Sequence, residues 1–546
     1  MRSASHLLGA FLFISLIGSE ALCAEAVLPA IDQLPAVARS PSGLFEVNEF
    51  RFTNNTVFST EELCRITRHY VGRRIGATEL EAARIAVTSN YVARGYINSG
   101  AILDHPPGAD GIVLLRIVEG QLTDVSVRSN RWIHSRFYEN RIGLRSARPL
   151  NVNELRDRLQ VWRQAYPIEQ LNAELRPGVH PGEAQLDLTV RERWPYHLGV
   201  QYANDRPPST GSEQVTALAQ IDTLTGHNDP FTFNYVIARG GSPGFRDAEF
   251  LGVDDLSVAY RYPVTSRDTT VGARYIRSSA SIIEEAFREL DITAQSELFG
   301  VTVSQPVWRT HSKDLSLEVM AEHKSNSSFL LGVPYDFSPG SVDGETALTA
   351  IRIAGQFVSR SQRQVLAARL TLSTGISALD VTENEEGPDW QFFSLLGQAQ
   401  YIRRLGTSDH QWVARVTGQY SPDPLLSLEQ LIIGGASTVR GYRESSLLRD
   451  TGILASLEFR LALWARRQGN PYLQLVPFAD LGAGWNNDRP TPAPDTIGSI
   501  GIGAVVTPLK QVEISAFWGY PFRRIESPGH DLQDEGIHFA LRVWAF

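Results

Sequence analysis

One short run of residues decides how the C-terminal part of this chain folds: Gly434-Gly435-Ala436-Ser437-Thr438-Val439-Arg440-Gly441-Tyr442. It lies on a long connection, residues 421–451, between two segments in which apolar and polar residues alternate. Further along, Phe478-Ala479-Asp480 lies on another alternating segment. Alternation with a period of two is typical of a β-strand whose two faces meet different surroundings. The pattern therefore predicts a strand that presents an aromatic ring and a carboxylate on one face, within reach of Arg440.

Segments of the same kind repeat from residue 194 to residue 546. Each is about ten residues long, stretches rich in Gly, Pro, Asn and Asp separate them, and sixteen can be counted. In one of the clearest, the apolar face carries Ile453, Ala455, Leu457, Phe459, Leu461 and Leu463. The polar face carries Ser456, Glu458 and Arg460. An apolar face that is nearly unbroken across consecutive strands favours contact with lipid, where a closed β-barrel pairs every backbone group.

A soluble β-sandwich would alternate in the same way, so the N-terminus bears on the choice. Arg2 precedes an apolar core of 12 residues, Leu7 to Gly18, and small residues follow it. This pattern predicts a secretory signal peptide over residues 1–26. The residues before Cys23 fit poorly with the alternative, processing as a lipoprotein. No run of 18 apolar residues follows the signal, so the sequence predicts no transmembrane helix.

The C-terminus points the same way. Phe546 ends the last alternating segment. A C-terminal aromatic at this position resembles the recognition signal of outer-membrane barrels. Phe546 shares a face with Arg542, whereas the opposite face of the segment is uniformly apolar.

Residues 45–193 have a different pattern, in which helices and strands are mixed twice in the order β-α-α-β-β. In the first copy we expect strands at Val47–Phe52, Tyr96–Leu103 and Ile112–Val118, with helices opened by the capping boxes Ser59-x-x-Glu62 and Thr78-x-x-Glu81. In the second copy we expect strands at Gln121–Val127, Leu171–Leu175 and Ala184–Val190, a short helix within Trp132–Ile142, and a helix capped at Asn151-x-x-Glu154. The pattern predicts two α+β modules, residues 45–120 and 121–193.

Two smaller features complete the N-terminal region. Cys64 is the one cysteine after the signal, and its neighbours in the first helical pattern predict a small buried apolar residue. Residues 27–44 form a short segment with three prolines, which oppose a long helix.

The motif around Arg440 predicts an anchor for a loop that folds back into a barrel lumen. Asp480 and Phe478 face the same way by alternation, so a guanidinium can pair with the carboxylate through two hydrogen bonds and stack on the ring. Glu458, on the inward face of the preceding segment, is a second acceptor. Glycines would allow the turn inward and the close approach of the backbone. They are Gly434, Gly435 and Gly441.

Other functions find little support in the sequence. The net charge of −9 gives no indication of nucleic-acid binding. The chain has no nucleophile elbow, phosphate-binding loop or zinc motif, and the acidic cluster at Glu284 and Glu285 is expected to be a solvated loop or a lumen face. We expect no catalytic residue, no cofactor and no metal.

The whole arrangement resembles a known family. Val439-Arg440-Gly441-Tyr442 lies between the eleventh and twelfth alternating segments, and Phe478-x-Asp480 lies on the thirteenth. This layout is similar to the Omp85 superfamily, and two preceding modules that resemble POTRA domains narrow it to the TpsB transporters of two-partner secretion, the haemolysin activation/secretion (ShlB/FhaC/HecB) family.

The resemblance implies a fold and a place in the cell. The fold is two α+β POTRA domains followed by a 16-stranded antiparallel transmembrane β-barrel over residues 194–546. The barrel would lie in the outer membrane of a Gram-negative bacterium, in contact with its lipid, and the POTRA domains would lie in the periplasm. Arg440 and Asp480 would lock the sixth extracellular loop inside the barrel.

The resemblance also implies a function. The POTRA domains would capture a secreted partner exoprotein, typically large, β-helical and encoded nearby, and the barrel would translocate it. Candidate capture edges are Tyr96–Leu103 and Leu171–Leu175. The barrel itself would depend on the barrel-assembly machinery for insertion. Family members often carry an N-terminal plug helix, which residues 27–44 predict to be absent or vestigial here.

Three alternatives stay open at this point. An outer-membrane insertase of the same superfamily usually carries three or five POTRA modules, and this chain has room for two. A passive porin would not need the POTRA pair or the Arg440 motif. An outer-membrane lipid hydrolase would need a catalytic set that the sequence lacks.

Overall fold

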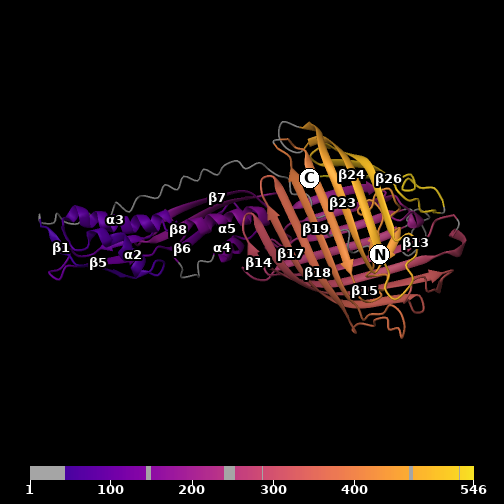
Figure 1. Ribbon diagram of the computed structural model, residues 1–546, viewed down its shortest axis with the longest axis horizontal. Helices are drawn as coiled ribbons and strands as arrows, with labels where there is room; N and C mark the ends of the chain where they lie inside the picture. Colours follow the sequence, from indigo (N-terminus) through magenta and orange to yellow (C-terminus); the bar gives the residue numbers. More distant parts are fainter. Residues whose placement is uncertain are drawn as a thin grey trace. The chain divides into compact units, whose positions relative to one another are not determined.

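The computed structural model describes residues 43–142, 149–238, 253–285, 287–406, 408–465, 471–527 and 529–545. These residues form two compact units, one that ends at Trp194 and one that begins at Pro195 (Figure 1). The predicted signal peptide, most of the proline-containing segment and Phe546 lie outside the described residues. None of the described helices is both long and apolar enough to cross a membrane.

The first unit contains two small α+β modules. In the first module, a parallel and an antiparallel pairing build a sheet in the order β2-β5-β4, and a separate pair, β1 with β3, lies beside it. The strands are β1 (Phe45–Val47), β2 (Glu49–Thr53), β3 (Arg73–Ile75), β4 (Gly100–Leu103) and β5 (Ile112–Val118). The helices are α2 (Thr60–Thr67), η2 (Arg68–Tyr70) and α3 (Ala77–Ala93).

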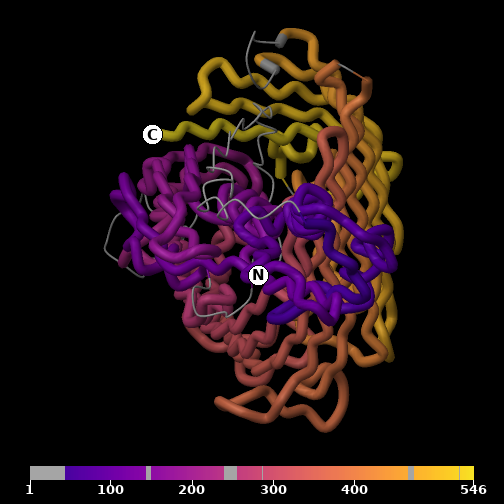
Figure 2. The backbone as a smooth tube through the Cα atoms, turned by 90° about the vertical axis from the view of Figure 1, so that its left-hand side faces the viewer, coloured from indigo at the N-terminus to yellow at the C-terminus, as the bar shows by residue number. Residues whose placement is uncertain are grey.

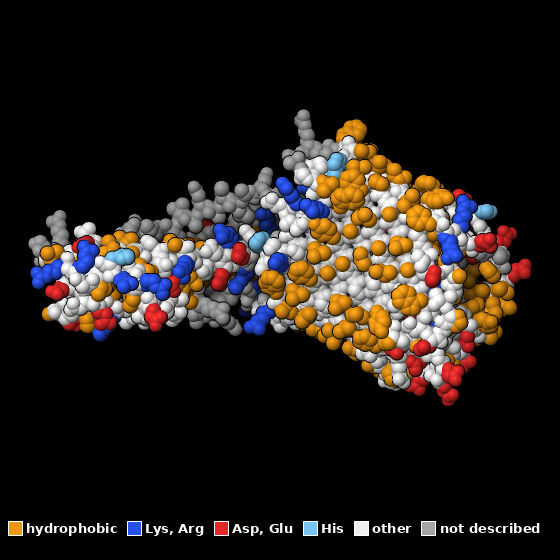
Figure 3. Space-filling view, viewed as in Figure 1, with side chains coloured by type: hydrophobic (Ala, Val, Ile, Leu, Met, Phe, Trp, Pro, Cys, Tyr) orange, Lys and Arg blue, Asp and Glu red, His pale blue; other side chains and the backbone are white. Residues whose placement is uncertain are grey.

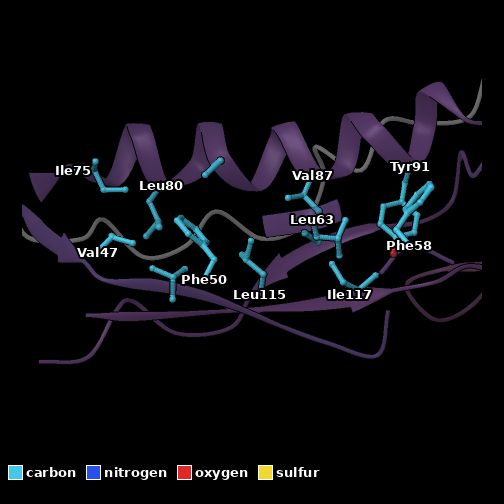
Figure 4. Packing of buried hydrophobic residues seen from close by; sticks show 13 residues of the cluster. Val47, Phe50, Phe58, Leu63, Ile75, Leu80, Val87, Tyr91, Leu115 and Ile117 are labelled. Atoms are coloured by element: carbon cyan, nitrogen blue, oxygen red, sulfur yellow. The ribbon is translucent and has the colours of Figure 1, made fainter. Parts of the chain in front are cut away.

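Helices α2 and α3 cover one face of this sheet, and the core lies between them. Residues of α3 spaced three or four apart are buried in this core: Leu80, Ala83, Val87 and Tyr91. Leu80, Val87 and Tyr91 point towards side chains of the sheet (Figure 4). The sheet contributes Phe50, Leu115 and Ile117.

Local structure differs from the sequence prediction at several points of this module. The strand predicted at Val47–Phe52 is interrupted at Asn48, whose side-chain amide bonds the carbonyl of Asp110 at 3.1 Å. Helix α3 begins two residues earlier than predicted: Gly76 is the N-cap in place of Thr78, and the Glu79 side chain accepts its N–H at 3.2 Å. The strand predicted from Tyr96 begins only at Gly100.

The prediction for Cys64 is wrong, because its side chain is exposed. Helix α2 buries the face that carries Leu63 and Thr67, four residues apart. Cys64 follows Leu63 directly and is therefore turned by about 100° from that face.

The second module repeats the topology of the first. Its sheet has the order β6-β8-β7, with β6 parallel and β7 antiparallel to β8. The elements are β6 (Gln121–Arg128), α4 (Ser135–Ile142), α5 (Val152–Ala165), β7 (Ile168–Pro177) and β8 (Glu183–Glu192). Asn151 caps α5 by accepting the N–H of Asn153 at 2.9 Å.

The second unit is a closed antiparallel β-barrel of sixteen strands, with β16 (Val333–Pro334) as a short extension on β15. The strands follow one another around the wall in chain order (Figures 1 and 2), and β27 pairs with β9 to close it. They are β9 (Tyr196–Ala203), β10 (Gln214–Ile221), β11 (Phe231–Ala238), β12 (Val253–Pro263), β13 (Thr270–Ser281), β14 (Thr293–Arg309), β15 (Lys313–Leu330), β17 (Glu345–Arg360), β18 (Gln364–Ile376), β19 (Phe393–Arg404), β20 (Gln411–Tyr420), β23 (Thr451–Ala465), β24 (Pro471–Trp485), β25 (Thr496–Leu509), β26 (Val512–Pro521) and β27 (Ile537–Trp544).

The two faces of the wall differ as the alternation predicts. On β23, Ile453 and Leu457 are about half exposed, whereas Glu458 is 2% exposed. Apolar side chains spread over the outside of the barrel (Figure 3). Because the charged side chains of β23 avoid this surface and the apolar ones occupy it, the outer face suits the hydrocarbon of a bilayer and the inner face encloses a polar lumen.

Candidate functional site: a loop anchored in the barrel lumen

The connection between the eleventh strand, β20, and the twelfth, β23, folds into the lumen. Its ends form a small hairpin of β21 (Leu431–Ile433) and β22 (Leu447–Arg449), and the motif around Arg440 lies between these two strands. Apolar residues of the loop and the wall form a cluster: Leu431, Ile433, Val439, Tyr442, Leu447, Leu454 and Ile497. The hairpin packs against the wall and thereby presents Arg440 to it.

The wall offers a patch of four side chains from two neighbouring strands. In the antiparallel register of β23 and β24, Ser456 lies opposite Asp480, and Glu458 lies opposite Phe478. Residues two apart on one strand face the same way, so all four point into the lumen. Strand pairing alone therefore assembles a carboxylate pair beside an aromatic ring.

Arg440 uses the whole of this patch. Its Nε donates to Asp480 Oδ2 at 2.7 Å and its Nη2 to Asp480 Oδ1 at 2.8 Å, a bidentate pair. Its Nη1 donates to Glu458 Oε1 at 2.9 Å. The guanidinium carbon lies 3.6 Å from the centre of the Phe478 ring. Arg440 is 5% exposed and Asp480 is 3% exposed, so the contact is almost fully desolvated.

The backbone of Arg440 binds the same carboxylate, since its N–H donates to Asp480 Oδ2 at 3.1 Å. Glu458 in turn accepts from Arg415 at 2.7 Å and from Arg460 at 2.9 and 3.0 Å. Three arginines thus surround two carboxylates. Arg440 of the loop therefore joins a network of ion pairs that the wall residues Arg415, Arg460 and Glu458 form among themselves.

Gly441 makes the close approach of the loop possible. Its φ is +89°, and a Cβ at this position would lie 2.8 Å from the carbonyl oxygen of Gly519 on β26. A side chain would therefore meet both backbone strain and the wall itself. Gly434 and Gly435, where the hairpin turns, also have positive φ, +106° and +108°.

Two contacts of the motif were not part of the sequence prediction. The N–H of Gly441 donates to Nε2 of His538 on β27 at 3.2 Å, which assigns the His538 ring the tautomer that carries its proton on Nδ1. The Tyr442 hydroxyl donates to the carbonyl of Gly498 at 3.0 Å. Alternation places His538 on the inward face of the last strand, but the sequence gives no sign of its partner.

Arg443 joins the loop to two other connections at the same end of the barrel. It donates to Asp534, between β26 and β27, at 2.6 and 2.7 Å, and to Glu284, between β13 and β14, at 2.7 Å. Glu284 is therefore an ion-pair partner of the loop, which fits the second of the two predicted surroundings, a lumen face, better than a solvated loop. Burial tends to raise the pKa of Asp534, but hydrogen bonds from Arg443 and Ser527 outweigh it and lower the pKa.

Comparisons with known proteins agree with this architecture. Residues 182–506 match the model of the family described as haemolysin secretion/activation protein ShlB/FhaC/HecB, and residues 45–120 match the POTRA domain of ShlB type. The outer membrane transporter CdiB of Dickeya dadantii is 24% identical over 454 residues, which are 80% of this chain and 77% of that protein.

Two further relatives are similar to the chain. The hemolysin transporter protein ShlB of Serratia marcescens is 22% identical over 384 residues, 69% of this chain and 65% of that protein. The solved structure of CdiB from Escherichia coli superimposes with a TM-score of 0.68 at 20% identity, and the alignment covers 94% of this chain and 92% of that one.

Proposed function

The chain belongs to the haemolysin secretion/activation family ShlB/FhaC/HecB, and we propose from this premise how its parts divide the work of secretion. It is an outer-membrane transporter of two-partner secretion with its POTRA domains in the periplasm, and its partner is a secreted exoprotein. The proposal concerns which residues close the barrel and which edges bind the partner.

The observation that carries the proposal is the bidentate contact of Arg440 with Asp480. A loop inside a closed barrel blocks passage for as long as it stays there. Breaking one side of a buried pair costs about 3–5 kcal/mol, so an arginine held in this way keeps the loop in place without a covalent bond. We assign the closing of the lumen to Gly434, Gly435, Val439, Arg440, Gly441 and Tyr442, with Glu458, Phe478 and Asp480 as their receptors on the wall.

Capture of the partner is assigned to the POTRA edges. In the described part of the first unit, β4 and β7 each have a single neighbouring strand, β5 and β8 respectively. Among the described residues, neither strand has a partner strand on its outer side, where an extended segment can add by β-augmentation. At β4 the added segment would replace the bonds that Ala101 makes with Thr88 and Arg84 of α3. The partner would be large and β-helical, and its folding outside the cell would drive its passage.

The proposed organisation of the chain follows from these roles. Residues 1–26 are the signal peptide, 27–44 a short connecting segment, 45–120 and 121–193 the two POTRA domains, and 194–546 the barrel with loop 421–451. Phe546 would be read by the barrel-assembly machinery during insertion, and the apolar outer face would contact lipid.

The test is secretion of the exoprotein encoded beside this chain. Cells would carry the wild-type transporter, Arg440→Ala, or no transporter, and the exoprotein in the medium would be measured along with the amount of folded transporter in the outer membrane. We expect the exoprotein to reach the medium only with the wild-type transporter. We expect Arg440→Ala to be present, folded, in the outer membrane all the same. If secretion survives deletion of the transporter while other barrels fail to assemble, the chain is an insertase instead.

A further inference from the structure

The lumen loop makes a second charged contact, eleven residues before Arg440. Glu429 Oε1 accepts from Lys324 Nζ of β15 at 2.7 Å and from Arg352 Nη2 of β17 at 2.6 Å. Its other oxygen accepts from Arg352 Nη1 at 3.0 Å. The side chain of Glu429 is 6% exposed and those of Lys324 and Arg352 are 10% exposed, so this contact is nearly as dry as the one at Arg440.

The wall side of this contact is a network with an excess of positive charge. Arg352 Nε also donates to Glu322 Oε2 at 2.8 Å, and Arg274 of β13 contacts the same carboxylate. Arg274, Lys324 and Arg352 carry three positive charges against the single negative charge of Glu322. Without Glu429 the wall would hold two uncompensated cations in a water-poor site.

The contact has the opposite polarity to the one at Arg440. There the loop supplies the cation and the wall supplies two carboxylates, whereas here the loop supplies the anion and the wall supplies cations. Strands β18, β19 and β20 separate β17 from β23 around the wall, so the two contacts hold the loop on different sides of the lumen. Exchanging the two loop residues between the sites would place like charges together, which fixes the orientation of the loop.

Apolar packing holds the first part of the loop at the same place on the wall. Leu425 and Leu426, just before Glu429 in the loop, are buried against Leu348 and Ala350 of β17. The backbone carbonyl of Leu428 also accepts from Lys324 Nζ at 3.2 Å. The first part of the loop therefore docks on β15 and β17 before the chain crosses to β23 and β24.

We propose that Glu429 is a second positioning residue of the lumen loop, and that the barrel opens fully only when both Glu429 and Arg440 leave their receptors. This inference rests on the proposed role of the loop in closing the lumen. It adds that when Arg440 alone leaves its receptors, Glu429 still binds Lys324 and Arg352. The first part of the loop then stays in the lumen, and the barrel is only partly open.

The test is the conductance of the full chain in planar lipid bilayers. Four proteins would be compared: the wild type, Arg440→Ala, Glu429→Gln and the combination of both changes. Glu318→Gln is a matched control, because Glu318 also lies on β15 and pairs with Arg369 of β18, away from the loop. Heat-dependent electrophoretic mobility would establish that each variant is folded.

We expect Glu429→Gln to raise the time spent in open states by about tenfold, since it removes one side of a buried pair, and the control to stay within about twofold. We expect the double variant to reach a larger conductance than either single change. If Glu429→Gln does not fold, Lys324→Gln weakens the same contact by changing one of its partners on the wall. We expect this variant to give a smaller rise in the time spent in open states.

Each failure has its own meaning. Opening by Arg440→Ala with no effect of Glu429→Gln, or of Lys324→Gln in its place, would overturn the second anchor and leave the proposed function intact. If neither the Arg440 nor the Glu429 variant changes the conductance, the loop does not close the barrel, and both proposals fail. A rise with Glu318→Gln equal to that with Glu429→Gln would also overturn the inference, since any lost wall charge would then suffice.

Discussion

At the scale of single residues, Arg440 contributes geometry as well as charge. Its planar guanidinium meets Asp480 through two nitrogens and Glu458 through the third, and one face stacks on Phe478. A lysine at this position would bring a single ammonium group and no planar face. The arrangement therefore depends on the shape of the side chain, and on a backbone that comes close enough to the wall to deliver it.

Gly441 controls that approach and yields the first prediction. We expect Gly441→Ala to weaken loop closure by about 1–3 kcal/mol or more, because its φ of +89° is strained for alanine and the new Cβ would collide with the Gly519 carbonyl. The open fraction in bilayer recordings should rise accordingly. Gly387→Ala is the control, since it has a φ of +93° but nothing within 4 Å of the added Cβ. An equal effect of both changes would show that the collision is unimportant.

At the scale of elements, each POTRA domain has a carboxylate at the end of its last strand. In both domains this carboxylate binds the turn before a helix. Glu119, just after β5, accepts the N–H groups of Thr56 and Val57 at 2.7 and 2.8 Å and the Tyr91 hydroxyl at 3.0 Å. Glu192, at the end of β8, does the same for its own domain. It accepts the N–H groups of Arg131, Trp132 and Ile133 at 2.9, 2.5 and 3.2 Å and the Tyr138 hydroxyl at 2.9 Å.

Burial and the neighbouring carboxylate raise the pKa of both tyrosines well above the ordinary value, so each hydroxyl stays a donor. We predict that Glu192→Gln destabilises the second domain by about 1–3 kcal/mol, since buried N–H donors lose a charged acceptor. Hydrogen exchange of the full chain should then show faster exchange at residues 131–133. Glu169→Gln, which removes an exposed ion pair with Arg191, should change little; a comparable effect would refute the special role of Glu192.

The contact between Arg443 and Asp534 predicts a pH dependence. Because the pKa of Asp534 in the folded chain lies below the unfolded value of about 3.9, the contact stabilises the folded loop at every higher pH and is lost as the pH falls through the folded pKa. We expect bilayer conductance to be unaffected by this group from about pH 8 to about pH 5 and to rise only in stronger acid. Asp534→Asn should reduce the acid-dependent part of the rise. Loss of the contact near neutral pH would contradict the assignment.

At the scale of the whole molecule, the barrel closes between β27 and β9 and encloses a lumen wide enough for an aqueous channel, which loop 421–451 partly occupies. Loop 421–451 has contacts with at least five of the sixteen strands, including β15, β17, β23, β24 and β27. Because these contacts come from side chains and backbone on several strands, the loop and the wall stabilise one another. The loop that we propose to close the lumen is therefore also part of the folded core of the barrel.

If this loop limits the resting conductance, the segment before the first POTRA domain should matter little. Its prolines, Pro29, Pro35 and Pro41, oppose a long plug helix. We predict that deletion of residues 27–42 leaves the conductance nearly unchanged, whereas Arg440→Ala raises it in the same recordings. A large rise after the deletion would instead assign the plugging role to this segment.

The sequence by itself determined the order of modules, the sixteen barrel strands and the face that the alternating residues of the clearest strands take. Glu458, Phe478 and Asp480 fall on a common inner face because strands alternate with a period of two and neighbouring strands pair in register. The tertiary structure alone decided which partners meet across that space. Gly441 meets His538, and Glu429 meets Lys324 and Arg352, although these partners lie far apart in the chain. The periodicity of a strand predicts which face a residue takes, but it does not predict which residue lies across the lumen from it. Barrel closure and the path of one loop bring them together, just as the packing of α2 decided that Cys64 faces solvent.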